Sequence, residues 1–542
     1  MPKTLTRRTF LSLVAASGAA AVLNACQPIV TPKPTAAITA EPYVTSTPTA
    51  MALIPPTRAM LPASWANLPR WRGFNLLEKY TLSGNQPYQE WDFDFAARNG
   101  FNFFRLPADY RIWTIVPGQY REAPLKEIDQ AIHWGQARGI HTSLCLHRAP
   151  GYCVNPPEET LNLWADGDNG VEARRQFAEQ WAMFAKRYQG IPSEALSFDL
   201  VNEPPNIAPA MYLRAIKAAV DAIRAVDPER LIIADGLSYG NQPVTELIPL
   251  QVAQSTRGYG PMQLSHYRAN WINGSDRWPL PVWPVPTSAN AYLYGDEKPD
   301  FRSPLVLNGN FASAAQLDIT IQKVSNLADL AVRADGVVIF QKRFQPGSGT
   351  GEWKSAEYKP EWGIFQNTYD RVYSTTIPAG THRVELSVDI GDWLTFSEIR
   401  IHPYTGSSSE ELVIQPLDQD WGVKQDSYLV DPYGQLHSEK NRESIDRQVL
   451  WMKDVVPWVD LMGKGVGVHV GEWGVYSYTP HDVALAWMHD CLANWKQAGM
   501  GWALWNLRGS FGILDSGRTD VTYQQHEGHL LDRAMLDLLT QG

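Results

Sequence analysis

Leu196-Ser-Phe-Asp-Leu-Val-Asn-Glu-Pro-Pro205 is the stretch around which the chain is organised. It opens as an apolar strand and ends on an amide and a carboxylate, Asn202 and Glu203. The two prolines that follow remove backbone donors, so strand pairing must stop and a loop must begin. A barrel of parallel strands presents its chemistry at this end of each strand. The stretch therefore predicts either a catalytic carboxylate or a solvated turn, and the rest of the chain has to distinguish them.

Strand-like and helix-like segments alternate on both sides of this stretch. The expected strands are about 71–77, 101–107, 141–147, 196–201, 231–235, 262–267, 466–472 and 500–506. The expected helices are about 89–99, 125–138, 171–188, 208–226, 244–255, 444–462, 481–497 and 528–539. Mostly apolar strands that alternate with helices favour a (β/α)8 TIM barrel. An open doubly wound sheet is the alternative, but no glycine-rich nucleotide-binding motif follows any strand.

The alternation stops after the sixth expected strand and resumes near residue 444. Within residues 301–404, hydrophobic residues recur with period two, and Asn308-Gly309 and Asp335-Gly336 supply hairpin turns. We therefore expect an all-β sandwich inserted after strand six, with the barrel formed by residues 64–300 and 405–542. The sandwich either binds carbohydrate through aromatic residues or shapes the wall of the cleft, with those residues in its core. The aromatic candidates are Trp353, Trp362 and Trp393.

Residues 1–26 have the features of an export signal. The paired arginines Arg7 and Arg8 precede an apolar run that is too short for a stable membrane span, which resembles a twin-arginine signal. Leu23-Asn-Ala-Cys26 resembles a bacterial lipobox, with Cys26 as the residue that would be lipidated. Residues 27–63 are rich in Pro, Thr and Ala, which predicts an extended tether. We expect a cell-surface lipoprotein, exported by the twin-arginine route, whose lipid anchor is its one contact with the membrane.

Composition limits the partners that the protein can have. The net charge of −10 argues against nucleic acid, which needs a basic face. No His/Cys cluster has the spacing of a zinc site, and we expect neither a metal nor a cofactor. Cys145 and Cys153 are close enough in sequence to pair if the turn between them allows it, whereas Cys491 fits a buried thiol. We expect a monomer.

Polar or aromatic residues end most of the predicted strands. They are Arg105, His147, Asn202 with Glu203, His266 with Tyr267, Glu472 and Trp505. Each alone is more typical of a structural hydrogen bond, but together they would project into one mouth of the barrel. Two carboxylates on opposing strands suit cleavage of a glycosidic bond by double displacement, which needs them about 5 Å apart. Arg105 would keep the nucleophile ionised, Asn202 would bind the sugar 2-hydroxyl, and Trp505 would support the ring.

Two motifs carry a resemblance to a known family. Asn202-Glu203-Pro204 and Gly471-Glu472-Trp473-Gly474 resemble the acid/base and nucleophile motifs of glycoside hydrolase family 5, the cellulase-like retaining hydrolases with a (β/α)8 barrel. The resemblance covers most of residues 65–275 and 440–542. It implies Glu203 as general acid/base and Glu472 as nucleophile. It also implies that four other predicted residues belong to the active site, namely Arg105, His147, His266 and Trp505.

One departure from the family pattern concerns strand six. Many members carry His-x-Tyr there, with the tyrosine bonded to the nucleophile. In this chain the order is His266-Tyr267-Arg268, so Tyr267 comes one residue early. Strand alternation would turn its side chain to the other face. Either the strand end bends or another group holds Glu472.

These features together predict a retaining β-glycoside hydrolase that cleaves a β-linked polysaccharide or oligosaccharide, of the cellulase, β-glucanase or β-mannanase kind. One alternative is a transglycosylase that uses the same residues. The other is a surface lipoprotein that binds glycans without turnover, although the presence of both carboxylates, Glu203 and Glu472, speaks against it.

Overall fold

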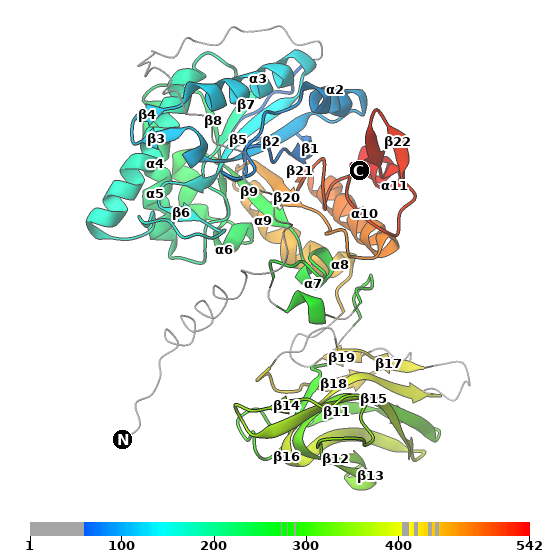
Figure 1. Ribbon diagram of the computed structural model, residues 1–542. Coiled ribbons are helices and arrows are strands. Elements are labelled where there is room, and N and C mark those ends of the chain that lie inside the picture. Colours follow the sequence, from blue (N-terminus) through cyan, green and yellow to red (C-terminus); the bar gives the residue numbers. More distant parts are fainter. Residues whose placement is uncertain are drawn as a thin grey trace, which may run out of the picture.

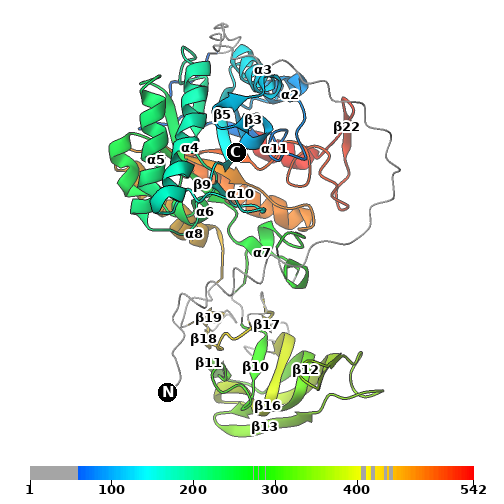
Figure 2. The same cartoon turned by 60° about the vertical axis from the view of Figure 1, so that its left-hand side comes forward.

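The computed structural model describes residues 59–272, 274–278, 280–286, 289–403, 411–416, 421–431, 436–438 and 444–542. Residues 1–26, Cys26 included, and most of the expected tether lie outside these ranges. Figure 1 shows a barrel with surrounding helices and a second, all-β domain, and Figure 2 shows both after a 60° turn. None of the helices in the described ranges is both long and apolar enough to cross a membrane.

The first sheet closes into a barrel of eight parallel strands, because β1 pairs with both β2 and β21, and β2 also pairs with β5. The short strand β6 (Tyr152–Cys153) adds to it antiparallel. The barrel strands are β1 (Arg72–Asn75), β2 (Phe103–Asp109), β5 (His141–Ala149), β7 (Leu196–Asp199), β8 (Leu231–Asp235), β9 (Ala253–Gly258), β20 (Val468–Trp473) and β21 (Gly501–Leu504). The predicted (β/α)8 barrel with an inserted β domain is confirmed.

Helices cover the barrel strands with their apolar faces. They are α2 (Glu90–Arg98), α3 (Glu122–Arg138), α4 (Gly167–Arg187), α5 (Pro209–Arg224), α8 (Arg447–Leu450), η4 (Trp451–Val455), α9 (Val456–Met462), α10 (His481–Ala498) and α11 (Arg533–Gln541). Gly139 and Gly499 end α3 and α10 at φ 65° and 75°, a left-handed conformation that glycine adopts without a steric penalty. On α5, Ile216 and Ile223 are fully buried. Side-chain packing between helices and strands therefore forms one continuous core.

The prediction for the sixth barrel strand is wrong. The strand is β9, whereas residues 262–267 contain the short helix α7 (Met262–Ser265). The helix expected over 244–255 is instead the 3-10 helix η2 (Thr245–Leu250), and β9 begins after two further residues. The segment Ala253-Gln-Ser-Thr-Arg-Gly258 is polar, yet its first five residues are buried. Its polar groups are bonded inside the fold: the Gln254 side chain, for example, pairs with the backbone N–H and C=O of Val244. Such a strand has no apolar signature in the sequence.

The inserted domain is a ten-stranded sheet with its own core. Its strands are β10 (Tyr292–Tyr294), β11 (Leu305–Phe311), β12 (Ala315–Ala334), β13 (Val337–Phe344), β14 (Tyr358–Lys359), β15 (Ile364–Ile377), β16 (Thr381–His402), β17 (Leu412–Ile414), β18 (Ser427–Val430) and β19 (Leu436–Ser438). The sheet thus extends beyond 301–404 on both sides. Of the aromatic candidates, Trp362 is 64% exposed, whereas Trp393 is 6% exposed and Trp353 packs against the core.

The chain enters and leaves the inserted domain at one place. Val285 and Ile445 form an isolated antiparallel bridge, with reciprocal backbone hydrogen bonds of 2.8 Å. This bridge follows β9 and precedes α8, so the insertion occupies the loop after the sixth barrel strand. Loops at this end of the strands carry the chemistry of barrels and tolerate insertions.

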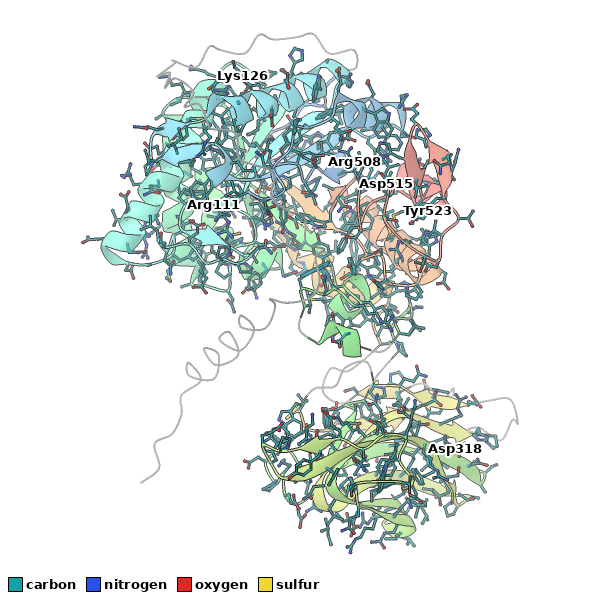
Figure 3. All side chains as sticks on the ribbon, in the orientation of Figure 1. Arg111, Lys126, Asp318, Arg508, Asp515 and Tyr523 are labelled. Atoms are coloured by element: carbon teal, nitrogen blue, oxygen red, sulfur yellow. The ribbon has the colours of Figure 1, made fainter. Side chains whose placement is uncertain are left out.

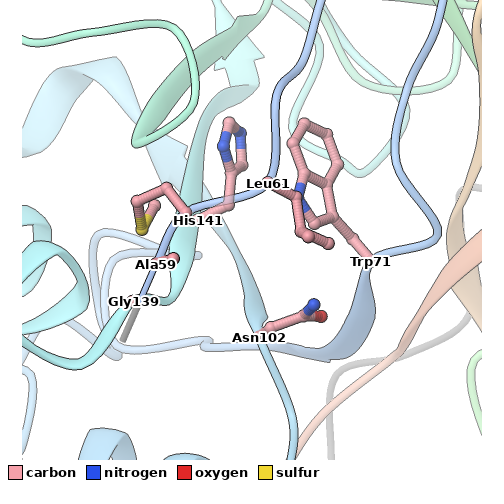
Figure 4. A pocket seen from close by; sticks show the side chains of 7 residues that line it. Ala59, Leu61, Trp71, Asn102, Gly139 and His141 are labelled. Atoms are coloured by element: carbon pink, nitrogen blue, oxygen red, sulfur yellow. The ribbon is translucent and has the colours of Figure 1, made fainter. Parts of the chain in front are cut away.

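The cysteines of the described residues, Cys145, Cys153 and Cys491, are free thiols, so Cys145 and Cys153 are not paired. A small pocket lies at the opposite, amino-terminal end of the barrel (Figure 4). Its lining is Ala59, Met60, Leu61, Trp71, Asn102, Gly139 and His141. Residues at that end of a barrel contribute to stability rather than to chemistry, so this pocket is separate from the candidate site.

Candidate active site

Glu203 lies just beyond β7, the fourth barrel strand, in a constrained backbone conformation. Its φ of 49° is in the left-handed region, which is uncommon for a residue with a side chain. Two contacts hold it there: its N–H donates to Oδ2 of Asp235 (2.8 Å), and its C=O accepts from the Tyr152 hydroxyl (2.6 Å). The carboxyl group is therefore directed by a fixed main chain.

Glu472 lies in β20, the seventh barrel strand, and is 3% exposed. Its Oε1 accepts from Nη1 of Arg105, which comes from β2. The same guanidinium donates to Asp199 (2.6 Å), to Asn75 (3.1 Å) and to Asn202 (2.8 Å). Arg105 is thus a fixed cation beside Glu472, as the sequence predicted.

A second buried arginine, Arg257 of β9, joins the two carboxylates. Its Nε donates to Oε1 of Glu203 at 3.0 Å, and its Nη2 lies 3.3 Å from Oε1 of Glu472. Both terminal nitrogens also pair with Asp235 at the end of β8. Asp235 therefore balances the charge of Arg257 and, through the Glu203 N–H, also holds the backbone of the acid. Sequence reasoning missed Arg257 because it placed the sixth strand elsewhere, and it gave no role to Asp235 although this residue ends the expected strand 231–235.

The electrostatics differ between the carboxyl groups of this site. Burial first, and the negative charge of Glu472 second, raise the pKa of Glu203 to about 7. Burial likewise raises the pKa of Asp199 to about 6. Like charges held close together in a buried site disfavour ionisation of all of them. Glu203 can therefore carry a proton near neutral pH. Glu472 is instead in contact with two cations, Arg105 and Arg257, and with the hydroxyl of Tyr259.

The tyrosine that reaches Glu472 is Tyr259, and the expectation for Tyr267 is corrected. The Tyr259 hydroxyl lies 3.4 Å from Oε2 of Glu472. Burial raises the pKa of this hydroxyl well above its usual value, which keeps it protonated as a donor. Tyr267 follows α7, with its ring against the guanidinium of Arg268. The spacing of an active-site residue and a tyrosine two positions later does exist here, as Arg257-Gly258-Tyr259.

His266 ends α7 instead of a strand, but it remains near the site. Its ring centroid lies 4.9 Å from that of Tyr259, and its Nδ1 is 2.9 Å from the Ser265 hydroxyl. Burial lowers its pKa to about 4, so the ring is neutral at neutral pH. His266 therefore supports Tyr259 by packing.

An aromatic group lies beside the carboxylates on the side of β1, β5 and β21. The ring of Tyr80 packs edge-on against His147 (4.4 Å between centroids) and Trp505 (5.5 Å). Asn155 accepts from the Tyr80 hydroxyl at 3.1 Å and lies 2.8 Å from Nε2 of His147. Burial lowers the pKa of His147 to about 3, so this ring is neutral too. The sequence predicted His147 and Trp505 but not Tyr80, which lies in a loop after β1.

Asn202 links the two arginines through its side chain. Its Oδ1 accepts from Arg105 (2.8 Å) and from Arg257 (2.9 Å). These two bonds fix the orientation of the amide, and its buried Nδ2 has no hydrogen-bond partner within the described ranges. That leaves one oriented donor next to the carboxylates. Among the described residues, no group of three or more His, Cys, Asp or Glu side chains is arranged to hold a metal.

A charged cluster behind β1 supports the loop that follows β21. Arg508 donates to Glu78 (2.6 Å) and to Asp92 (2.9 Å). Figure 3 shows Arg508 with Asp515 and Tyr523 on this side of the barrel, whereas Asp318 belongs to the inserted domain. Burial raises the pKa of Asp92 to about 7. The cluster therefore ties the Trp505 end of β21 to helix α2.

Comparison with known proteins identifies relatives of the barrel. Residues 63–266 match the family Cellulase (glycosyl hydrolase family 5). The chain is 28% identical over 189 residues to Endoglucanase C of Acetivibrio thermocellus and, equally, to Endoglucanase C307 of a Clostridium species. Each match covers 34% of this chain and 53% of the relative, so the chain spans about half the length of these curated relatives.

A solved structure extends the likeness to most of the fold. A crystal structure described as that of a glycoside hydrolase is 28% identical, with a TM-score of 0.55, and the match covers 87% of this chain and 99% of that one. The family match includes β7 with Asn202 and Glu203, around which the site is built. The part of the chain that is similar to cellulases of glycosyl hydrolase family 5 is therefore residues 63–266, which include both Asn202 and Glu203.

Proposed function

We propose that this protein is a retaining β-glycoside hydrolase in which Glu472 is the nucleophile and Glu203 the general acid/base. The observation that carries the proposal is the sharing of one guanidinium, that of Arg257, by the two carboxyl groups. A single guanidinium spans only a few ångströms, so this arrangement supports the close spacing, about 5 Å, of retaining enzymes. The endoglucanase relatives support a glycoside hydrolase.

In the first step, the Glu472 carboxylate attacks the anomeric carbon and the bond from that carbon to the leaving oxygen breaks. Glu203 gives its proton to the leaving oxygen, which departs as an alcohol, and Glu472 becomes a glycosyl ester. Because the pKa of Glu203 is raised to about 7, its carboxyl group can still hold this proton at neutral pH. Arg105 and Tyr259 hold Glu472 in its attacking position.

In the second step, Glu203 acts as a base. Esterification removes the negative charge of Glu472, which is one of the two main causes of the raised pKa of Glu203. Glu203 is therefore a carboxylate that takes a proton from water as the water oxygen attacks the anomeric carbon. The ester bond breaks, the sugar leaves with its original anomeric configuration, and both side chains return to their starting states.

The surroundings of the carboxylates suit a sugar ring. The oriented Nδ2 of Asn202 is a donor for a ring hydroxyl next to the anomeric carbon, a bond that strengthens in the transition state. Tyr80 and Trp505 offer apolar ring surface, and Trp505 is only partly buried. We propose a β-linked glycan as the substrate, with β-glucan first because of the endoglucanase relatives.

Chemical rescue tests the two roles separately. Glu472→Gly, incubated with an activated aryl β-glycoside and azide, should release the α-glycosyl azide, since azide then attacks from the face that the nucleophile occupied. Glu203→Gly under the same conditions should release the β-azide, formed from the intact glycosyl ester. The opposite pair of products would reverse the roles, and inversion of configuration by the wild type would exclude double displacement.

A panel of β-glucans and β-mannans tests the substrate class. Hydrolysis with release of reducing ends supports the proposal, whereas binding without hydrolysis would favour a glycan-binding lipoprotein. Transfer to added sugar acceptors in preference to water would favour a transglycosylase. We also propose that the protein is a monomer and that it is held at the cell surface through Cys26. Globomycin-sensitive processing and metabolic labelling with a fatty acid would test the lipid anchor at Cys26.

A further inference from the structure

A series of aromatic side chains runs from Glu472 to the protein surface. Tyr259, whose hydroxyl reaches Glu472, is the first, and Phe511 lies 6.3 Å from it between ring centroids. Tyr476 packs against Phe511 at 5.6 Å, and Trp271 contacts Tyr476 edge-on at 4.9 Å. Each of these residues lies in a loop after β9, β20 or β21, at the carboxyl end of the strands.

The outer end of this series is open to solvent, unlike its inner end. Trp271 is 55% exposed and Tyr478, whose ring lies 5.5 Å from that of Tyr476, is 57% exposed. Phe511 is 3% exposed. Large exposed aromatic rings next to a buried site mark a surface for a ligand with an apolar face. We call Trp271, Tyr476 and Tyr478 the aromatic strip.

The main chain that carries the strip is held in place. The N–H of Tyr476 donates to the carbonyl of Ser265 in α7 (2.8 Å), and the Thr479 hydroxyl donates to the carbonyl of Leu264 (2.5 Å). Nη1 of the buried Arg518 donates to the carbonyl of Thr479 at 2.7 Å. These bonds tie the loop after β20 to α7, so ordering the strip costs little when a ligand binds.

We infer that the aromatic strip binds sugar units of the glycan outside the pair that flanks the scissile bond. The inference deepens the proposed function and rests on it for the identity of the ligand. A neutral β-linked chain presents ring faces of C–H groups that pack on Trp and Tyr, and its next units must leave the site along its surface. Because the strip is continuous with Tyr259 and Glu472, it lies on such a path. The protein should therefore prefer long chains to short ones.

Binding to the full-length chain carrying Glu472→Gln tests this inference without turnover. Calorimetric titration with cello-oligosaccharides of increasing length, and manno-oligosaccharides as a second series, should give tighter binding for the longer members. Trp271→Ala and Tyr478→Ala, each added to this parent, should weaken binding of the longest member by about five- to twentyfold. Binding of the disaccharide should weaken much less.

Met452→Ala is the matched control, because Met452 is a similarly exposed apolar residue in the helical layer around the barrel. It should leave the dependence on chain length as in the parent. A parent affinity that does not rise with length, or an equal loss for short and long members in both variants, would overturn the inference. Two separate strip variants keep the test valid if one of them fails to melt cooperatively.

Hydrolysis by the wild type, measured in parallel, separates the two proposals. Hydrolysis by the wild type, combined with strip variants that keep the parent's preference for long chains, would overturn the strip alone. Length-dependent binding that needs Trp271 and Tyr478, without hydrolysis of either series by the wild type, would instead remove the proposed function and retain the strip as a glycan-binding surface.

Discussion

The guanidinium of Arg257 donates to the carboxyl group of Glu203 at 3.0 Å and lies 3.3 Å from that of Glu472. Its positive charge opposes the two effects that raise the pKa of Glu203, which are burial and the charge of Glu472. Asp235 is paired with Arg257 and acts in the other direction, since its negative charge raises the pKa of Glu203. The proton on Glu203 therefore depends on a buried ion pair between β8 and β9.

Substitutions in this ion pair should move the pH profile in opposite directions. Arg257→Gln removes a positive charge and should shift the alkaline limb of kcat/KM to higher pH, with kcat about tenfold to a hundredfold lower because Glu472 also loses a partner. Asp235→Asn removes a negative charge and should shift the limb to lower pH, while the amide oxygen, placed where Oδ2 of Asp235 lies, can still accept from the Glu203 N–H. The measurement is kcat/KM against pH on an aryl β-glycoside. Shifts of the same sign in both variants would contradict this role for the pair.

Because the pKa of Glu203 is raised in the folded protein, the stability of the fold should fall when Glu203 loses its proton. A carboxyl with a higher pKa in the native state than in the unfolded chain stabilises the native state while it is protonated. That contribution is complete below the ordinary value of 4.5 and is lost as the pH rises through about 7. Glu203→Gln cannot ionise, so it should melt about 2–4 °C above the wild type near pH 8, and the difference should shrink near pH 5.

Calorimetric melts at both pH values measure this difference. Glu158→Gln is the control, because Glu158 is exposed and its substitution should leave the melting temperature about the same at both pH values. A Glu203→Gln variant that is more stable at low pH than at high pH, relative to the wild type, would refute the raised pKa.

The two tyrosines near strand six should differ in their effect on catalysis. Tyr259→Phe removes the hydroxyl that reaches Glu472 and should lower kcat by about two- to tenfold, which corresponds to one hydrogen bond. Tyr267→Phe is the matched variant and should change kcat by less than about twofold, since the Tyr267 ring packs on Arg268 instead. Steady-state rates at the pH optimum measure both. A larger loss in Tyr267→Phe would restore the sequence-based assignment.

The inserted domain should be separable only at its true boundaries. Deletion of residues 286–444, with a short Gly-Ser link from Val285 to Ile445, should leave a barrel that melts cooperatively, because the backbones of these two residues are already hydrogen-bonded. Deletion of 301–404 should give an aggregating protein, because it leaves strands such as β10 and β18 without their partners β16 and β11. Calorimetry and size-exclusion chromatography distinguish the two products. A cooperative melt for the second deletion alone would contradict these boundaries.

The sequence by itself determined the barrel and its main chemical groups. Apolar strands such as Leu196–Asp199 alternate with amphipathic helices, and a buried parallel sheet requires that pattern. Where a polar residue came at the end of such a strand, as at Glu203 and Glu472, its place in the mouth of the barrel followed from the direction of the strands. The local pattern was sufficient there, because the apolar side chains of such a strand themselves indicate that it is buried.

The tertiary structure alone decided the sixth strand and the residues that it carries. The polar segment Ala253–Gly258 is stable in the barrel because Val244, Gly240 and Asp235 satisfy the side chains of Gln254, Thr256 and Arg257. Those partners are distant in the chain or in other elements, so no local pattern could indicate them. The same reason hid the outer strands of the inserted sheet, whose pairing with β11 and β16 depends on contacts across the fold. A buried polar group is stable only with its partner, and the fold brings the two together.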